Sequence, residues 1–315
     1  MGSISEPFGI PSISYAELVH NDQGARHLAA EAFAQALRVY GVCRVREHGI
    51  SQHKLDECFN KSRAFFNRDL HTKMADYRNS GLTSHARFIP FGSEQVRGEP
   101  HLDETIEFKY GVYEQASADH WAWSSPGREL IDASKSLHEE CIRIANDLLD
   151  CLSQSVGLST SLASIHGKGN TFFAPYYYYF RDDSDDNTLR VPPHIDPTTM
   201  LFCFQDSLGG LQAADMRDMT GNLSSAAVSK KAAFYPVKCQ PGEFVVLAGH
   251  ILRRLVGDIK HSVHRVERPV GTEGFHLNFW IVPRPDTRIG SGCAGKEEEV
   301  RAYLDRVFPG HLGGF

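Results

Sequence analysis

Several features are missing from this chain of 315 residues, and each absence narrows its class. It has no run of Lys and Arg, and its formal net charge is −6. Binding to nucleic acid is therefore not expected, because it needs clustered basic residues. No apolar stretch approaches the roughly 20 residues that span a bilayer, so no membrane association is expected. The N-terminus also lacks the basic patch and apolar run of a secretory signal.

Paired cysteines are absent as well. The seven cysteines are odd in number and widely spaced, and no C-x-x-C occurs. This pattern indicates free thiols in a reducing compartment and argues against a disulfide framework or a zinc site. We therefore expect a cytoplasmic protein. No obligate protein partner is evident from the sequence.

The first half of the chain has helical periodicity. Helical patterns cover residues 24–40, 51–66 and 127–156. In the first of them, one face carries Leu28, Ala32, Ala36 and Leu37. Ser51 is a suitable N-cap for the second pattern, because its hydroxyl can accept a hydrogen bond from a backbone N–H of the first turn.

The second half consists of short apolar or aromatic runs separated by turn residues. These runs cover residues 172–180, 199–205, 243–248, 262–266 and 275–282. Strands at this spacing favour a sandwich or barrel. The fold class is therefore α+β: a double-sheet jelly roll with helices packed on one face, mostly from the N-terminal part.

No linker divides the chain, so 1–315 is expected to form a single domain. Within it we expect an N-terminal helical and mixed region at 1–125 and a long buttress helix at 126–170. The jelly-roll catalytic core follows at 171–285, and a C-terminal helix and tail at 286–315. Substrate specificity is expected to come from 80–125 and from 284–315, because pocket-lining side chains and mobile segments set it.

The sequence contains three H-x-D pairs, of the kind that can bind a metal. Two neutral imidazoles and one carboxylate on one face of a metal form a non-haem iron site with open positions. Alternate strand residues point the same way, so H-x-D suits such a site. His20-x-Asp22 stands at a helix start, where Asp is a cap, and His101-x-Asp103 lies in a polar segment. Only His194-x-Asp196 precedes an apolar strand.

A second histidine completes the candidate site. His264 lies in a strand-like run seventy residues after His194, within the same β-rich half. Either histidine alone is better explained as an ordinary sheet residue. Together, in this context, they make His194, Asp196 and His264 the candidate ligands of an iron(II) ion.

Ordered segments around these residues make the chain similar to a known family, the isopenicillin-N-synthase-like iron(II)/2-oxoglutarate-dependent oxygenases. The resemblance spans roughly 9–287 and rests on five main segments: Ile10-Pro11-Ser12-Ile13, Gly41 to Val45, His194-x-Asp196, Gly209-Gly210-Leu211-Gln212 and Ser262 to Val266. It implies a double-stranded β-helix with helical buttresses. It also implies that iron binds His194, Asp196 and His264.

One departure from the family pattern concerns the cosubstrate. The family has an R-x-S pair on the strand after the second histidine, and its Arg binds the distal carboxylate of 2-oxoglutarate. Aligning the aromatic end of that strand puts His276 at the Arg position and Asn278 at the Ser position. An imidazole cannot make the bidentate contact of a guanidinium. His276 and Asn278 can each still offer one hydrogen bond.

Further candidates follow from the resemblance. Of the run Tyr176 to Tyr179, the face with Tyr177 and Tyr179 is predicted to contact the cosubstrate, although some of these tyrosines must simply fill a core. Arg190 is a further cosubstrate anchor, with a surface charge as the alternative. The candidates for substrate contact are Arg87, Phe202 and Phe204. Gly249-His250 replaces a Gly-Asp pair that is common upstream of the second histidine, and His250 is more simply a capping or surface residue.

The resemblance implies an oxidoreductase that couples oxidative decarboxylation of 2-oxoglutarate by O2 to hydroxylation, desaturation or cyclisation of a small organic molecule, as in secondary metabolism. One alternative keeps the fold and the iron but takes electrons from the substrate or from ascorbate, because the Arg is missing. A remote alternative is a non-catalytic jelly-roll binding protein. Three intact metal ligands argue against the latter, since a binding protein has no need of them.

Overall fold

The computed structural model describes residues 8–79, 85–96, 98–115, 124–179, 189–267, 273–290 and 297–307. Its helices are α1 (Tyr15–Leu18), α2 (Gln23–Val39), α3 (Gln52–Phe66), α4 (Leu70–Asn79), α5 (Gly111–Gln115), α6 (Ser125–Ser155), α7 (Ser225–Ser229), α8 (His250–Leu255) and α9 (Val300–Val307), with a short 3₁₀ turn at Leu162–Ile165. The helical patterns predicted at 24–40, 51–66 and 127–156 correspond to α2, α3 and α6. Ser51 caps α3 through its hydroxyl, as predicted.

Two sheets form the core. The larger has the order β1 (Ser12–Ser14), β2 (Val42–Arg46), β12 (Glu243–Ala248), β9 (Met200–Gln205), β14 (Gly274–Pro283), β7 (His166–Tyr178), β6 (Glu104–Lys109) and β3 (Ala86–Ile89). The smaller has the order β11 (Phe234–Pro236), β10 (Leu211–Ala214), β13 (His264–Val266) and β8 (Val191–His194). Two hairpins are added by β4 (Gln95–Val96) with β5 (Glu99–Pro100) and by β15 (Arg288–Ile289) with β16 (Glu298–Glu299). The predicted α+β jelly roll is confirmed.

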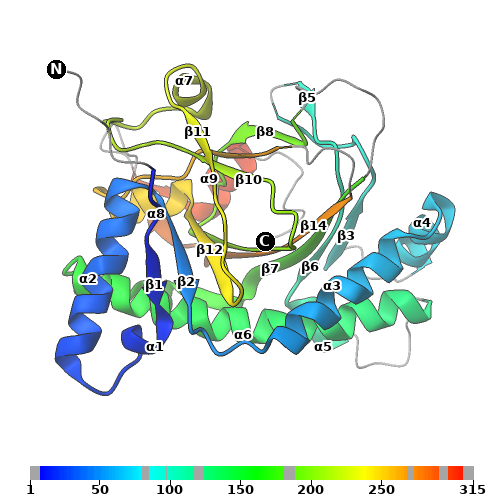
Figure 1. Ribbon diagram of the computed structural model, residues 1–315, viewed down its shortest axis with the longest axis horizontal. Coiled ribbons are helices and arrows are strands. Elements are labelled where there is room, and N and C mark those ends of the chain that lie inside the picture. The colour runs from blue at the N-terminus through cyan, green and yellow to red at the C-terminus, as the bar shows by residue number, and fades with distance from the viewer. Residues whose placement is uncertain are drawn as a thin grey trace.

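The long helices α2, α3 and α6 cover one face of the large sheet, which we call the outer face. Figure 1 shows α6 running along the base of the molecule beneath the strands, with α2 and α3 beside it. Alternate residues of the central strands, such as Phe173, Phe202 and Phe279, pack with these helices in one continuous core. The opposite, inner face looks toward the small sheet. The two faces of the same strands therefore have different surroundings.

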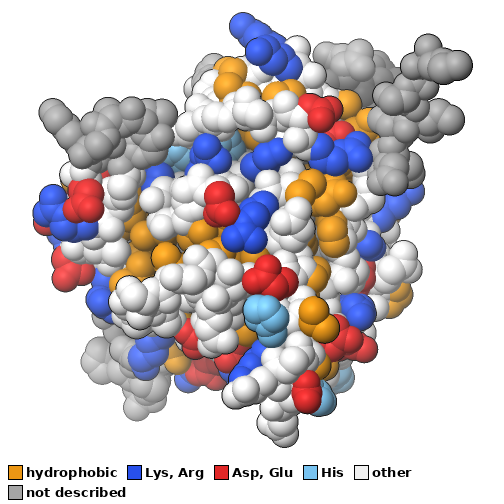
Figure 2. Space-filling view, turned by 90° about the vertical axis from the view of Figure 1, so that its left-hand side faces the viewer, with side chains coloured by type: hydrophobic (Ala, Val, Ile, Leu, Met, Phe, Trp, Pro, Cys, Tyr) orange, Lys and Arg blue, Asp and Glu red, His pale blue; other side chains and the backbone are white. Residues whose placement is uncertain are grey.

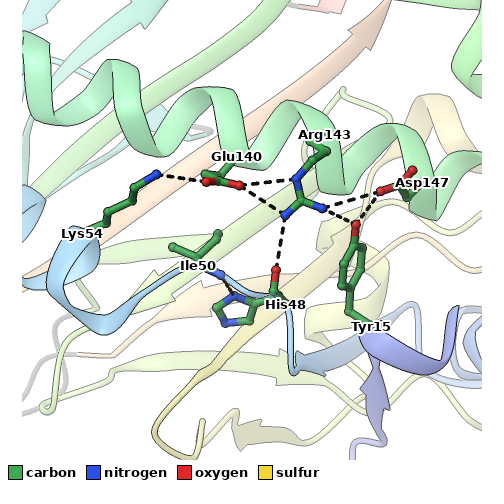
Figure 3. A network of polar contacts seen from close by, with 7 residues as sticks. All are labelled: Tyr15, His48, Ile50, Lys54, Glu140, Arg143 and Asp147. Carbon is green, nitrogen blue, oxygen red and sulfur yellow. Dashed lines mark hydrogen bonds and ion pairs between the residues drawn. The ribbon is translucent and has the colours of Figure 1, made fainter. Parts of the chain in front are cut away.

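A polar network fastens the N-terminal elements to α6 (Figure 3). Arg143 of α6 donates hydrogen bonds to the Tyr15 hydroxyl and to the backbone carbonyl of His48. The Tyr15 hydroxyl in turn donates a hydrogen bond to Asp147. Lys54 of α3 pairs with Glu140 at 2.9 Å. Most of these groups are partly exposed, so the network orients α1 and α3 more than it stabilises the fold.

One detail of α2 differs from the sequence prediction. Of the face predicted from helical spacing, Ala36 and Leu37 are buried, but Leu28 is 71% exposed and Ala32 is also exposed. The buried stripe runs instead through Ala29, Ala30 and Phe33. Several small alanines allowed two overlapping stripes at helical spacing, and packing against β2 and α6 selected the one that contains the large Phe33.

The surface agrees with the mixed composition of the chain. On the face shown in Figure 2, side chains of Lys and Arg are interspersed with those of Asp and Glu. Within the described residues, no helix is both long and apolar enough to cross a membrane. The six described cysteines are free thiols, as predicted, and Cys293 lies outside the described residues.

Candidate functional site

Three side chains predicted as metal ligands converge between neighbouring strands of the small sheet. β8 ends at His194 and β13 begins at His264, and the antiparallel register pairs these two residues directly. Asp196 follows β8 by two residues, so its carboxylate turns to the same side. The donor atoms of the three side chains all lie within 4.8 Å of one another. Among the described residues, this is the one His, Cys, Asp and Glu group with that geometry.

The hydrogen bonding of this cluster fits a divalent cation. His194 Nδ1 donates to the Pro192 carbonyl at 2.9 Å, which leaves the lone pair of Nε2 directed at the cluster. Asp196 Oδ2 is buried and has no hydrogen-bond partner among the described residues. Burial and the neighbouring His194 lower the pKa of His264, which keeps its imidazole neutral. A buried carboxylate beside two imidazoles is a donor set suited to iron(II).

The carboxylate has its own electrostatic balance. Burial raises the pKa of Asp196, while His194 and a hydrogen bond from the Trp280 indole oppose that rise. An ionised carboxylate in such a place is costly unless a cation or donors compensate it. A metal ion at the cluster would supply that compensation.

The cluster opens into a cavity of about 690 Å³ between the two sheets. From the large sheet it is lined by alternate residues of the inner face: Glu107, Phe172, Tyr176, Tyr178, Leu201, Cys203, His276, Asn278, Trp280 and Val282. The small sheet contributes Val191, His194, Leu211, His264 and Val266, and α8 and α9 close one end with His250, Tyr303 and Val307. The predicted residues His276 and Asn278 therefore reach the cavity.

His276 is already engaged by protein groups. Its Nε2 bonds the Gly209 carbonyl at 2.9 Å, and its Nδ1 lies 3.3 Å from the Tyr178 hydroxyl. It is 1% exposed, and burial lowers its pKa, so the ring is neutral. It cannot act as the missing Arg. Asn278 differs, because its Oδ1 has no hydrogen-bond partner among the described residues.

The predicted face of the tyrosine run was wrong. Tyr176 and Tyr178 line the cavity, whereas Tyr177 and Tyr179 point to the outer face. Tyr179 binds the buried ion pair of Lys73 and Glu104 from that side. β7 lies within the large sheet, paired with β14, so its alternate residues point to opposite faces. The helices cover the outer face, and Tyr177 and Tyr179 therefore become core residues.

Phe202 and Phe204 are corrected for the same reason. Both belong to the helix-covered core, and their rings lie 4.8 and 5.0 Å from that of Phe244. Their neighbours Leu201 and Cys203 face the cavity instead. Neither phenylalanine can contact a substrate there.

The two predicted arginines lie behind the cavity wall. Arg190 is 2% exposed, and its guanidinium carbon is 5.2 Å from the centre of the Tyr178 ring. The Arg190 guanidinium also lies beside Gly274, at the start of β14: a Cβ placed on that glycine would be 3.9 Å from Arg190 Nη1. Arg87 instead pairs with Glu94 and Glu107, whose side chains line the cavity.

Sequence reasoning missed one part of the wall. His101, dismissed with its H-x-D pair, lines the cavity, and its ring centre is 6.2 Å from that of His194. Asp103 beside it is buried away from solvent, and that burial raises its pKa. A polar segment without a long strand gave no periodicity from which this placement could be read.

Comparisons with known proteins agree with this geometry. Residues 10–127 match the family model described as the N-terminal part of the non-haem dioxygenases in morphine synthesis. Residues 170–283 match the model of the 2OG-Fe(II) oxygenase superfamily. This chain belongs to the 2OG-Fe(II) oxygenase superfamily. It is an iron(II)- and 2-oxoglutarate-dependent dioxygenase, and the predicted isopenicillin-N-synthase-like resemblance is confirmed.

Individual relatives cover most of the chain. A 2-oxoglutarate-dependent dioxygenase, frbA, of Dothideomycetidae sp. (strain 11243) is 26% identical over 84% of this chain and 80% of its own length. The naringenin,2-oxoglutarate 3-dioxygenase of Arabidopsis thaliana is 26% identical over 89% and 74%. A full-length Neurospora crassa protein, solved in complex with alpha-KG, superimposes with a TM-score of 0.74, 19% identity and 95% coverage of both chains, which shows the shared fold.

Proposed function

We propose that this oxygenase binds iron(II) through His194, Asp196 and His264 and oxidises a small organic molecule in the adjoining cavity. One observation carries the proposal: a buried Asp196 oxygen, with no hydrogen-bond partner among the described residues, faces the imidazoles of His194 and His264 at the cavity wall. When bound, iron(II) and 2-oxoglutarate supply the oxidising chemistry, in which O2 converts 2-oxoglutarate to succinate and CO2 as the substrate is oxidised.

The protein's own residues provide orientation. The Pro192 carbonyl fixes the tautomer of His194, and the Trp280 indole holds the Asp196 carboxylate. The register of β8 and β13 sets the two histidines side by side, with ring centres 4.2 Å apart. Ligand positions defined by strands and by such second contacts are fixed before a metal binds.

For the cosubstrate, we infer that the distal carboxylate binds near the end of the cavity formed by Tyr178, His276 and Asn278. Asn278 offers the N–H donors of its amide there, and the Tyr178 hydroxyl, which donates to His276 Nδ1 at 3.3 Å, would turn from that ring to the carboxylate. Arg190 lies directly behind Tyr178 and supplies the positive charge that His276 lacks. Arg190 comes from the segment before β8, so the charge would reach this end from the small sheet.

The class of substrate follows from cavity size and from the relatives. A cavity of about 690 Å³ with aromatic and aliphatic walls suits a small molecule. The Arabidopsis relative is named for a reaction on naringenin, and the Neurospora neighbour was solved with alpha-KG. We propose a role in secondary metabolism, with hydroxylation, desaturation and cyclisation all open as outcomes. Cell fractionation would test the predicted cytoplasmic location.

Anaerobic addition of iron(II) and then 2-oxoglutarate tests the function. A visible charge-transfer band is expected for the wild type and should be absent from His194→Ala and His264→Ala. If no band forms but O2 is consumed when a substrate or ascorbate is present, the enzyme works without 2-oxoglutarate. Failure of the wild type to bind iron would overturn the proposal.

A further inference from the structure

The end of the cavity at α8 and α9 contains a histidine that the iron site does not use. His250 is the first residue of α8, and its backbone N–H donates to the Asp196 carbonyl at 2.8 Å. Gly249 makes this approach possible, because a Cβ there would overlap the Thr198 carbonyl oxygen. The backbone therefore fixes an imidazole beside the candidate metal ligands, on the cavity wall.

Helix α9 sets the orientation of that imidazole. The Tyr303 hydroxyl and His250 Nδ1 are 2.6 Å apart. Burial raises the pKa of Tyr303, so its hydroxyl keeps its proton and donates it to Nδ1. The hydrogen of the imidazole is then on Nε2, the nitrogen for which no protein partner is seen among the described residues. His250 thus presents an N–H donor.

A second polar group lies next to it. Thr198 lines the same cavity and is 7% exposed, and its Oγ1 has no hydrogen-bond partner among the described residues. The Thr198 carbonyl accepts the backbone N–H of Ile251 at 3.1 Å, which ties the residue to the start of α8. A buried hydroxyl without a partner costs free energy, so a ligand oxygen that bonds it is favoured.

The charges around the cavity distinguish its two ends. Behind Tyr303 lie Arg254 and Arg306, with guanidinium carbons 4.9 and 5.6 Å from the ring centre; both pair with the one carboxylate of Glu298, so a net positive charge is left there. The wall near β4 and β6 instead presents the carboxylates of Glu94 and Glu107. An electron-rich oxygen is therefore favoured at the α8–α9 end and disfavoured at the acidic wall.

We propose that His250 and Thr198 form a substrate-recognition subsite that hydrogen-bonds a carbonyl or phenolic oxygen of an otherwise apolar ring compound. The ring would rest on Trp280, Val282 and Val307, which line the cavity together with these two residues. Tyr303 acts as a positioning residue, because it touches His250 and sets its tautomer. The inference rests on the proposed function, in which this cavity takes the substrate.

Ligand-observed NMR with the full chain tests the subsite by means of two probes, 1-tetralone and tetralin, which differ in one carbonyl oxygen. The wild type should prefer 1-tetralone by about 5-fold, the value of one net hydrogen bond. His250→Leu and Thr198→Val should each reduce that preference to less than about 2-fold. His250→Gln keeps an N–H donor and should retain most of it, and Tyr303→Phe should weaken it. His53→Leu, an exposed histidine on α3, is the matched control.

Each remaining outcome counts against the subsite. Equal binding of the two probes by the wild type, or no binding of 1-tetralone, would overturn it. An unchanged preference in His250→Leu would do the same. The iron(II)–2-oxoglutarate band, recorded on the same samples, separates the two ideas: a normal band with no preference refutes only the subsite, whereas a missing band refutes the proposed function.

Discussion

The two faces of the large sheet are built from the same strands but have opposite properties. On the outer face, Phe173 and Phe279 pack against the helices in a continuous apolar core. On the inner face, their neighbours in the sequence line a cavity with hydrogen-bonding groups, among them His276, Asn278 and Tyr178. Strand alternation alone produces this division. It teaches that substitutions one residue apart should affect stability in one case and ligand binding in the other.

The largest effect of a substitution is expected on ligand binding at the inner face, for the metal ligand Asp196. Asp196→Ala removes the one carboxylate of the cluster, so iron(II) affinity should fall by more than about 100-fold. That exceeds the usual loss of about 10- to 100-fold when a residue that only hydrogen-bonds to a metal ligand is removed. Anaerobic iron titration measures this. His20→Ala, from another H-x-D pair, is the control and should bind iron normally. Comparable iron binding by Asp196→Ala would refute the assigned site.

The outer face contains a buried ion pair whose loss should destabilise the fold. Lys73 Nζ lies 2.5 Å from Glu104 and 3.0 Å from the Tyr179 hydroxyl, and both charged residues are buried. Lys73→Met should lower the free energy of unfolding by about 3–5 kcal/mol, because Glu104 stays buried without its partner. Urea denaturation measures this value. Lys61→Met, which breaks an exposed pair with Glu129, should leave the free energy of unfolding nearly unchanged.

The third prediction concerns the charge behind the inner face. Arg190→Met should weaken 2-oxoglutarate binding by about 10- to 100-fold, because it removes a buried positive charge that lies behind Tyr178 at this end of the cavity. Binding of 2-oxobutyrate, which lacks the distal carboxylate, should change little. Titration of the charge-transfer band with each acid gives both affinities. Equal losses for the two acids would show that Arg190 does not act on the distal carboxylate.

A pH effect is expected from the outer face. His138 of α6 packs on Phe173 and Phe279, bonds Tyr113 and Thr171, and burial lowers its pKa from 6.5 to about 3. The unfolded chain binds a proton below pH 6.5 and the folded chain does not, so stability falls between pH 6.5 and about 3.

The size of this pH effect can be measured by substitution. Between pH 7.5 and 5.5, the wild type should lose about 1.4 kcal/mol more than His138→Gln. Urea denaturation at the two pH values provides the comparison. Parallel losses in the two proteins would show that His138 is not the group responsible.

The smallest effect comes from a matched pair of tyrosines. Tyr178→Phe removes a hydroxyl from the cavity and should weaken 2-oxoglutarate binding about 5-fold. Tyr177→Phe removes the hydroxyl that donates to Glu273 at 2.7 Å, and should cost about 1 kcal/mol of stability without changing that binding. Titration of the charge-transfer band measures 2-oxoglutarate binding, and urea denaturation measures stability, in both variants. Weaker binding by Tyr177→Phe with a loss of stability in Tyr178→Phe would contradict the assignment of faces.

The sequence predicted the elements of this fold better than their orientation. Helical period and turn residues located α2, α3, α6 and the central strands, because these signals are local. The face of a strand is not local: a shift of one residue exchanges every side chain between core and cavity. That is why Tyr177 and Tyr179 were placed on the wrong side, although their sharing of a face was correct.

The sequence by itself determined the class of chemistry, because H-x-D with a distant histidine, in the order of a known family, restricts the ligand types and their strand spacing. Only the tertiary structure decided what surrounds them. It brought His101 and His250 to the cavity wall and Arg190 to a place behind that wall, from three separate segments. It also bound both nitrogens of His276 to protein groups. Such contacts depend on how sheets and helices pack, and chain spacing alone does not encode them in a readable way.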